Sequence, residues 1–185
     1  MTRTLRYAMV FACLICAQAL STEAADSRPS GVLIIHAGGQ PAEKYRSSEL
    51  TREDLDAITM ATPKAYNTHT IAADLGRELE SRGIEVKVID ASEIKSHEII
   101  FEYSVMVLGA PARYGEVGWE MKRFIDEMIW RIHCLVPDRF ADHRVTAYAM
   151  GASSEGGTTA VLNFLEGIMT ANRTTLRARA DFLRH

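Results

Sequence analysis

A first group of residues that could do chemistry is Asn67, Thr68 and Thr70, within the segment ATPKAYNTHT. Side-chain donors beside the backbone N–H groups of a helix N-terminus are typical of phosphate binding. The same residue types also serve as ordinary helix caps, and the segment taken alone favours a cap. It becomes a candidate phosphate site only if neighbouring segments supply the rest of a ligand site.

A second group lies in the segment GAPARYGEVGWEMKRF, from 109 to 124. Its glycines permit close approach of the backbone to a ligand, and an aromatic side chain could lie against a flat heterocycle. We expect Trp119 to belong to the helix core, which leaves Tyr114 as the better contact residue, with Arg113 beside it. The segment therefore predicts a surface for an aromatic ligand.

A third group is the segment MGASSEGGTT, from 150 to 159, which carries three glycines and two serines. Such a turn can present several backbone N–H groups to the polar edge of a ligand. A single glycine-rich turn is weak evidence. Its position after a predicted strand gives it weight.

Alternating strands and helices must position these three segments. Apolar or alternating runs predict strands at 31–35, 85–90, 103–111 and 144–151, and helical spacing predicts helices at 68–82, 118–133 and 158–169. The alternation predicts one α/β domain with a doubly wound parallel sheet. Ligands bind such sheets outside the carboxyl ends of the strands, so we expect the three segments to lie together.

The connection between the first strand and the first helix is unusually long, about 30 residues, and loops of that length are commonly functional or disordered. Within it, the spacing of Leu50, Leu55 and Ile58 predicts a small helix at 48–59. We expect an insertion over about 40–62 that could act as a lid.

The three segments together resemble a known family. VMVLGAPARYGEVGWEMKRFIDEM resembles the flavodoxin-like NAD(P)H:quinone oxidoreductases of the WrbA type, whose pattern there is close to G-x-P-x-R-Y-G followed by M-K-x-F-I-D. GASSEGGTT is similar to the family's turn after the fourth strand. TPKAYNTHTIAADL is similar to the phosphate loop of related NADPH-dependent FMN reductases. The matches occur in the family's order and span roughly residues 31–170.

The resemblance implies a flavodoxin-like sheet that binds FMN at all three segments. The residues implied at the phosphate are Asn67, Thr68, His69 and Thr70; those bordering the isoalloxazine ring are Pro111, Ala112, Arg113, Tyr114 and Gly115; those at the ring's polar edge or the ribityl chain are Ser153, Ser154, Gly156 and Gly157.

Two departures from the family pattern affect these expectations. Glu155 stands where the family commonly has a histidine, which bears on any nicotinamide or quinone contact. The family also continues with a fifth strand and helix, whereas IMTANRTTLRARADFLRH predicts neither, so we expect strand order 2-1-3-4 with the fifth strand missing. The exposed fourth strand would then be covered by another subunit or by the segment from Asn172, or the chain is a truncated product.

The resemblance implies an FMN-dependent oxidoreductase that passes electrons from NAD(P)H to a quinone or similar acceptor, and a homo-oligomer. The flavin carries that chemistry, so no catalytic acid, base or nucleophile is expected. The alternatives are a non-enzymatic flavodoxin-type electron carrier and a truncated domain without flavin. A mild formal charge of −3 indicates no nucleic-acid partner.

The first 25 residues predict an export signal, because Arg3 and Arg6 precede an apolar run from Tyr7 to Leu20 and small residues follow. The run is shorter than the roughly 20 residues of a membrane-spanning helix. We therefore expect a periplasmic or secreted protein, with membrane association only if the segment stays uncleaved.

Cysteine and histidine usage predicts no metal site. Cys13 and Cys16 lie within the predicted signal, and we expect Cys134 to be a buried small hydrophobic residue. The six histidines are scattered without ligand spacing, so we expect exposed or capping roles for them.

Overall fold

The computed structural model describes residues 31–38, 67–141, 143–151, 157–174 and 176–183. The predicted signal at 1–25, the insertion at about 40–62 and the short helix predicted at 48–59 lie outside the described residues. The predictions for those segments therefore stay predictions.

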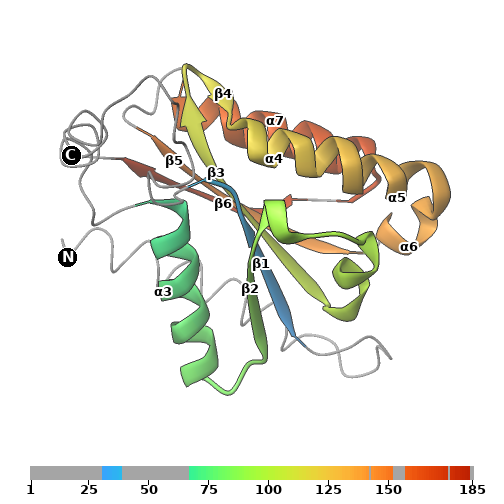
Figure 1. Cartoon of the computed structure of the whole chain (residues 1–185), viewed down its shortest axis with the longest axis horizontal. Helices are drawn as coiled ribbons and strands as arrows, with labels where there is room; N and C mark the ends of the chain where they lie inside the picture. The colour runs from blue at the N-terminus through green and yellow to red at the C-terminus, as the bar shows by residue number, and fades with distance from the viewer. Residues whose placement is uncertain (1–30, 39–66, 142, 152–156, 175, 184–185) are drawn as a thin grey trace, which may run out of the picture.

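A twisted parallel sheet forms the centre of the domain (Figure 1). Its strands, in spatial order, are β2 (Val86–Asp90), β1 (Val32–His36), β3 (Val105–Arg113), β5 (Arg144–Gly151) and β6 (Leu176–Leu183). A short strand, β4 (Glu116–Val117), pairs antiparallel with the end of β3. This arrangement confirms the predicted flavodoxin-like, doubly wound α/β fold.

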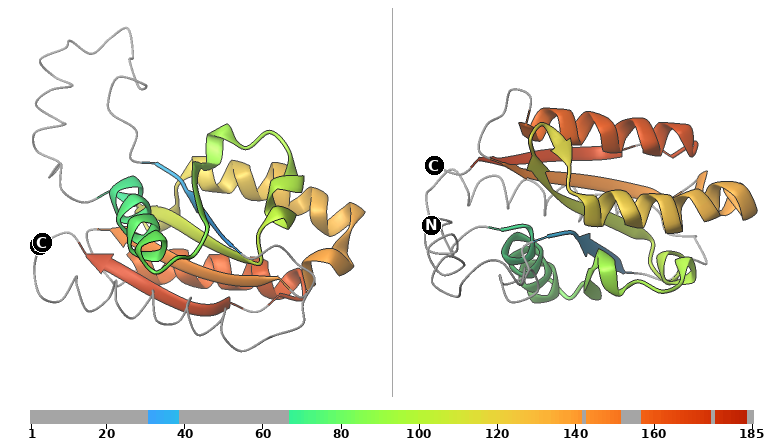
Figure 2. Two further views of the ribbon diagram at one scale, coloured as in Figure 1. Left: turned by 90° about the horizontal axis from the view of Figure 1, so that it is seen from below. Right: turned by 45° about the horizontal axis from the view of Figure 1, so that its top comes forward.

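Helices cover both faces of the sheet, as the right-hand view of Figure 2 shows. On one face lies α3 (Thr68–Ser81), and on the other lie α4 (Trp119–Phe124), α5 (Trp130–Leu135) and α7 (Thr159–Ala171). Every residue of β1 is buried, which explains why its sequence is a continuous apolar run instead of an alternating one. The core consequently divides into two apolar clusters, one on each side of the sheet.

The helix predicted at 118–133 is continuous but not uniform. Between α4 and α5 the chain widens into a π-helical segment, η4 (Ile125–Ile129). Ile125, Met128 and Ile129 all remain buried there. The wider turn thus keeps this apolar stripe against the sheet while the helix continues through it.

Short elements complete the fold. The turns η2 (Ala91–Glu93) and η3 (His97–Glu102) connect β2 to β3, and α6 (Pro137–Ala141) precedes β5. None of the helices in the described part of the chain combines the length and hydropathy that a membrane crossing requires.

The fifth strand, which the sequence analysis expected to be missing, is present as β6. It pairs in parallel with β5 from Val145↔Leu176 to Gly151↔Leu183, with a register shift between Val145 and Thr146. Ala180 of β6 packs against one core cluster. The edge of β5 is therefore covered by β6 of the same chain.

Two side chains expected in the core are exposed. Cys134 is an exposed free cysteine on α5, and Trp119 at the start of α4 is 54% exposed. Each lies on the solvent side of a helix whose opposite face supplies the buried residues, such as Met121 and Ile132. The residue types of Cys134 and Trp119 favour burial, but the position of each side chain around its helix determines whether it is buried.

Candidate functional site

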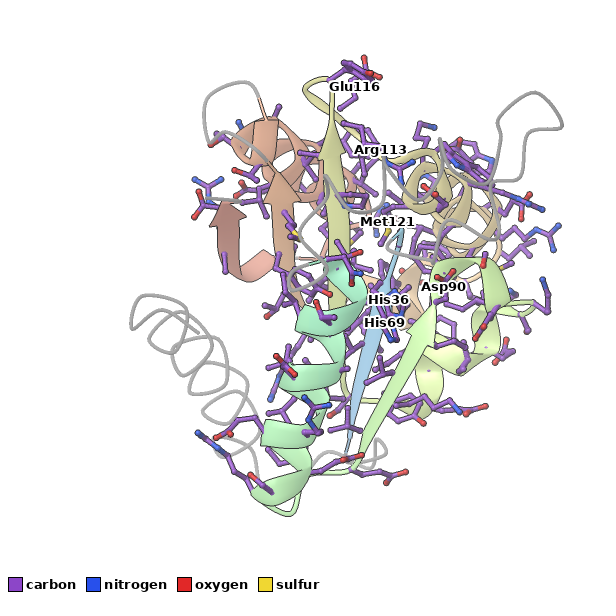
Figure 3. The ribbon with its side chains drawn as sticks, turned by 60° about the vertical axis from the view of Figure 1, so that its left-hand side comes forward. His36, His69, Asp90, Arg113, Glu116 and Met121 are labelled. Atoms are coloured by element: carbon purple, nitrogen blue, oxygen red, sulfur yellow. The ribbon has the colours of Figure 1, made fainter. Side chains whose placement is uncertain are left out.

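The C-terminal ends of the parallel strands meet at one edge of the sheet. His36 ends β1, Asp90 ends β2 and Arg113 ends β3. His69 of α3 lies beside His36 and Asp90, and Arg113 lies farther along the same edge (Figure 3). The first two predicted segments, at 67–70 and 111–115, therefore come to the same edge, as expected for a doubly wound sheet.

Asn67 and Thr70 form the reciprocal cap of α3. The Thr70 backbone N–H donates to Asn67 Oδ1 over 2.8 Å, and the Asn67 N–H donates to Thr70 Oγ1 over 3.0 Å. These two side chains therefore form the ordinary helix cap that their residue types predicted. The first turn contains no acidic side chain, so nothing within it neutralises the positive end of the helix dipole.

Thr68 ties the start of α3 to the end of β1. Its buried hydroxyl lies 2.7 Å from the carbonyl oxygens of both Ala37 and Gly38 and can donate to either. The Tyr148 hydroxyl of β5 donates to the Thr68 carbonyl over 2.6 Å. Burial raises the pKa of Tyr148, so it remains a neutral donor. The segment that follows β1 and the strand β5 therefore both fix the first turn of α3.

Replacing Tyr148 by phenylalanine is expected to lower the free energy of unfolding by about 1–3 kcal/mol, because the buried Thr68 carbonyl loses its 2.6 Å donor. Urea unfolding of the purified protein measures this. Tyr103→Phe is the matched control, since Tyr103 is only partly buried. Equal losses in both variants would contradict a specific role for the Tyr148 hydroxyl.

Tyr114 lies at the tip of a tight hairpin between β3 and β4. Tyr114 and Gly115 have φ values of 52° and 80°, the positive pair typical of a two-residue hairpin turn. A tyrosine rarely adopts this left-handed conformation. Its side chain is fully exposed, so the hairpin presents an aromatic ring to solvent beside the sheet edge.

Arg113 forms an ion pair with a buried carboxylate. Its Nη1 lies 3.4 Å from both oxygens of Glu120, which is 6% exposed. A Cβ added at Gly38 would come within 3.0 Å of Pro111 and 3.2 Å of Arg113. The segment after β1 and the segment after β3 are therefore in direct contact, which requires a glycine at position 38.

Replacing Arg113 by methionine is expected to lower the free energy of unfolding by about 2 kcal/mol, because the Glu120 carboxylate stays buried without this partner. Arg123→Met is the matched control, since its pair with Glu127 is exposed and should contribute less than about 1 kcal/mol. Chemical denaturation compares the two. A larger loss of unfolding free energy in Arg123→Met than in Arg113→Met would show that burial of the carboxylate does not determine the cost of losing its partner.

His36 and His69 form a contact that the sequence analysis missed. His36 Nε2 lies 3.2 Å from His69 Nδ1, and the rings meet edge to face with centroids 4.9 Å apart. His36 is 3% exposed, contrary to the exposed or capping role expected for the histidines; buried His143 is a second exception. Only the position of His36 at the end of a buried strand could have indicated this.

Asp90 completes this cluster on the other side of His36. Its Oδ2 lies 3.8 Å from His36 Nδ1, and its Oδ1 accepts from the N–H and hydroxyl of Ser92 at 2.8 and 2.6 Å. Burial lowers the pKa of His36 to about 4, an effect that the Asp90 carboxylate only partly offsets. His36 is therefore neutral at physiological pH.

A groove of about 370 Å³ opens between α3 and β2 beside this cluster. Its lining includes His36, His69 and Asp90, together with Arg77 and Glu80 of α3 and Glu93 of η2. No group of three potential metal ligands gathers here or elsewhere in the described ranges.

Half of the third predicted segment, residues 152–156, lies outside the described residues, and this half includes Ser153, Ser154 and Gly156. Gly157 is described and buried in the helical turn that leads into α7. The expectation that these four residues contact a ligand stays a prediction.

Comparison with known proteins places the fold. No protein-family model matches the sequence, and no curated protein matches it. Among solved structures, the Trp repressor binding protein from Bacillus subtilis aligns with a TM-score of 0.55 at 12% identity, over 83% of this chain and 85% of that one.

Two further solved structures have the same architecture. General stress protein 14 from Treponema denticola, in complex with FMN, has a TM-score of 0.53 at 13% identity, over 83% of this chain and 86% of its own. The two-electron reduced flavodoxin of Megasphaera elsdenii has a TM-score of 0.52 at 13% identity, over 81% and 84%. At these identities the likeness establishes a flavodoxin-like fold.

Proposed function

We propose that this protein is an FMN-dependent oxidoreductase that accepts electrons from NAD(P)H and passes them to a quinone or similar acceptor. The observation that carries the proposal is that the N-terminus of α3, whose first turn carries no acidic side chain, and the Arg113–Tyr114 hairpin lie at the same C-terminal sheet edge. This edge is where ligands bind in doubly wound folds. The FMN complex of general stress protein 14, which has the same fold, supports flavin as the ligand.

The side chains at this sheet edge fit FMN, but the roles expected for Asn67, Thr68 and Thr70 at the phosphate need one change. The Asn67 and Thr70 side chains cap the helix and the Thr68 hydroxyl lies against the segment after β1. We therefore expect the phosphate to be held mainly by backbone N–H groups of the first turn of α3, with His69 nearby. The Thr68 side chain would then act indirectly, by fixing the first turn of α3.

The hairpin would hold the other end of the ligand. Pro111 and Ala112 lie on the last part of β3, and Gly115 allows the turn that carries Tyr114. A fully exposed tyrosine in a left-handed conformation can stack on a flat ring at little cost in further desolvation. Bound flavin would supply hydride acceptance and electron transfer, and the chain would supply position and exclusion of water.

The experiment is an anaerobic reduction. The purified protein is loaded with FMN, desalted, and mixed with NADH or NADPH under argon while the visible spectrum is recorded. We expect retained flavin bands that bleach, followed by turnover with a benzoquinone. Retained bands that neither nucleotide bleaches would reject the reductase in favour of an electron carrier, and loss of all flavin would reject both.

Export remains part of this proposal, although residues 1–25 lie outside the described part of the chain. We expect residues 1–30 to direct a fused reporter out of the cytoplasm with cleavage near Ala25. A full-length cytoplasmic reporter would contradict export. Self-association is likewise proposed, and light scattering of the purified protein tests it.

A further inference from the structure

We infer that the outer face of the continuous helix formed by α4, η4 and α5 binds the same face of a second copy of this chain, antiparallel and about a twofold axis. The inference goes beyond the flavin chemistry proposed above and gives the proposed self-association a surface and a symmetry. We call this surface the 119–130 face, and it consists of Trp119, Lys122, Arg123, Asp126, Glu127 and Trp130.

The 119–130 face points away from the sheet along its whole length. Its residues recur at i, i+3, i+4, i+7, i+8 and i+11, which is the spacing of one side of a helix. The opposite side carries Met121, Phe124 and Met128, which are buried in the core. Figures 1 and 2 show this helix running along the outside of the domain, so its outer face is open to a partner.

The two ends of the face are tryptophans, and each is more than half exposed. The Trp130 ring stacks on His133, with centroids 5.3 Å apart and 20° between the planes, and this contact limits its freedom. Trp119 borders a cavity of about 190 Å³ between η2 and α4, whose lining includes Ile94 and Met128. Exposed tryptophans beside a partly apolar cavity are typical of the anchor residues of protein interfaces.

The charged side chains between the tryptophans are paired only along their own helix. Lys122 pairs with Asp126, and Arg123 pairs with Glu127 over 2.8 Å. All four side chains are about half exposed, and exposed pairs of this kind add little to stability. They can therefore exchange partners with a second helix at little cost to the fold.

The order of these residues selects the second copy as the partner. From Trp119 to Trp130 the face has a basic pair at 122–123 and then an acidic pair at 126–127, all symmetric about the midpoint of the segment. Two copies that cross antiparallel at that midpoint place basic side chains opposite acidic ones and Trp119 opposite Trp130 of the partner subunit. A parallel alignment places like charges opposite each other, so the charge pattern excludes it.

The size of the face sets the expected strength of the dimer. One helix face buries less than the roughly 800 Å² per partner of a standard interface. We therefore expect a reversible dimer that dissociates on dilution, with the tryptophans supplying most of the affinity and the charges fixing the direction.

The test exchanges the charges. Lys122→Glu/Arg123→Glu makes the face wholly acidic, and Asp126→Lys/Glu127→Lys makes it wholly basic. Sedimentation equilibrium should show a concentration-dependent dimer for the native protein, a monomer for each variant alone, and a dimer again when the two variants are mixed in equal amounts. Because the mixture restores association, misfolding of a variant cannot produce the expected result.

Two controls separate the 119–130 face from general effects of charge and hydrophobicity. Arg82→Glu/Lys87→Glu changes the net charge equally at exposed positions after α3 and on β2, and it should dimerise as the native protein does. Trp130→Ala should weaken dimerisation at least tenfold, whereas Leu135→Ala, an exposed apolar residue of α5 outside the face, should change it less than about twofold.

The same samples are titrated with FMN, so that this inference and the proposed function fail separately. A native protein that stays monomeric at every concentration, a charge variant that dimerises alone, or a mixture that stays monomeric overturns the twofold interface. If such a protein still binds FMN, only the interface is rejected. A dimer that follows the charge exchange but binds no FMN confirms the interface and rejects the proposed function.

Discussion

Replacing Gly109 by alanine is expected to lower the free energy of unfolding by about 3 kcal/mol. A Cβ at this position would lie 2.1 Å from Cζ of Tyr148, a ring that is 3% exposed and held by its hydrogen bond to Thr68. Overpacking of a well-filled core costs about 1–3 kcal/mol, and this ring is anchored at its far end, so the upper end of that range applies. Urea denaturation measures the change.

The same substitution should also weaken flavin binding, because displacing Tyr148 moves the first turn of α3. Gly167→Ala is the matched control: an added Cβ there meets nothing within 4 Å, and its helical position should gain about 0.5–1 kcal/mol. A Gly109→Ala protein as stable as the native one would show that the Tyr148 ring does not hold this corner of the sheet.

Acidification is expected to destabilise the protein through His36. Its pKa is lowered to about 4 from 6.5, so below pH 6.5 the unfolded chain binds a proton that the folded chain refuses. Stability from this residue is complete above pH 6.5 and is lost as the pH falls toward 4. The loss is about 2 kcal/mol at pH 5.

The measurement is the difference in unfolding free energy between pH 7.5 and pH 5, in the native protein and in His36→Gln. The variant should show a difference about 2 kcal/mol smaller, because its residue 36 does not titrate. His97→Gln serves as the control, since His97 lies on η3 beside exposed Glu98. An unchanged pH dependence in His36→Gln would mean that His36 is not buried in its neutral form.

Most of the sheet could be predicted because its strands are defined by local patterns. The apolar run at 31–35 and the strand at 144–151 match β1 and β5 within one residue at their bounds. The strand β6 was missed although Arg177, Arg179 and Asp181 alternate with apolar residues from Leu176 to Phe182. That alternation is the ordinary period of a strand, but the segment was judged too short and wrongly patterned for the strand and helix that the family adds there.

The candidate site could be predicted only in part. The helix N-terminus at Asn67 and the turn at Tyr114 follow from local residue types, and both lie at the sheet edge. The contact between His36 and His69 joins residues 33 apart, and no spacing rule connects them. Which side of a helix faces solvent also depends on tertiary packing, and this is why Trp119 and Cys134 were wrongly expected in the core.

The most direct test of the account is an equilibrium titration of the purified protein with FMN, followed by quenching of flavin fluorescence at neutral pH. The account predicts saturable binding of one FMN per chain, weakened at least tenfold in a Tyr114→Ala variant through lost ring stacking, which is about 1.4 kcal/mol. Flavin fluorescence that does not change at any protein concentration would contradict the assignment of this sheet edge as a flavin site.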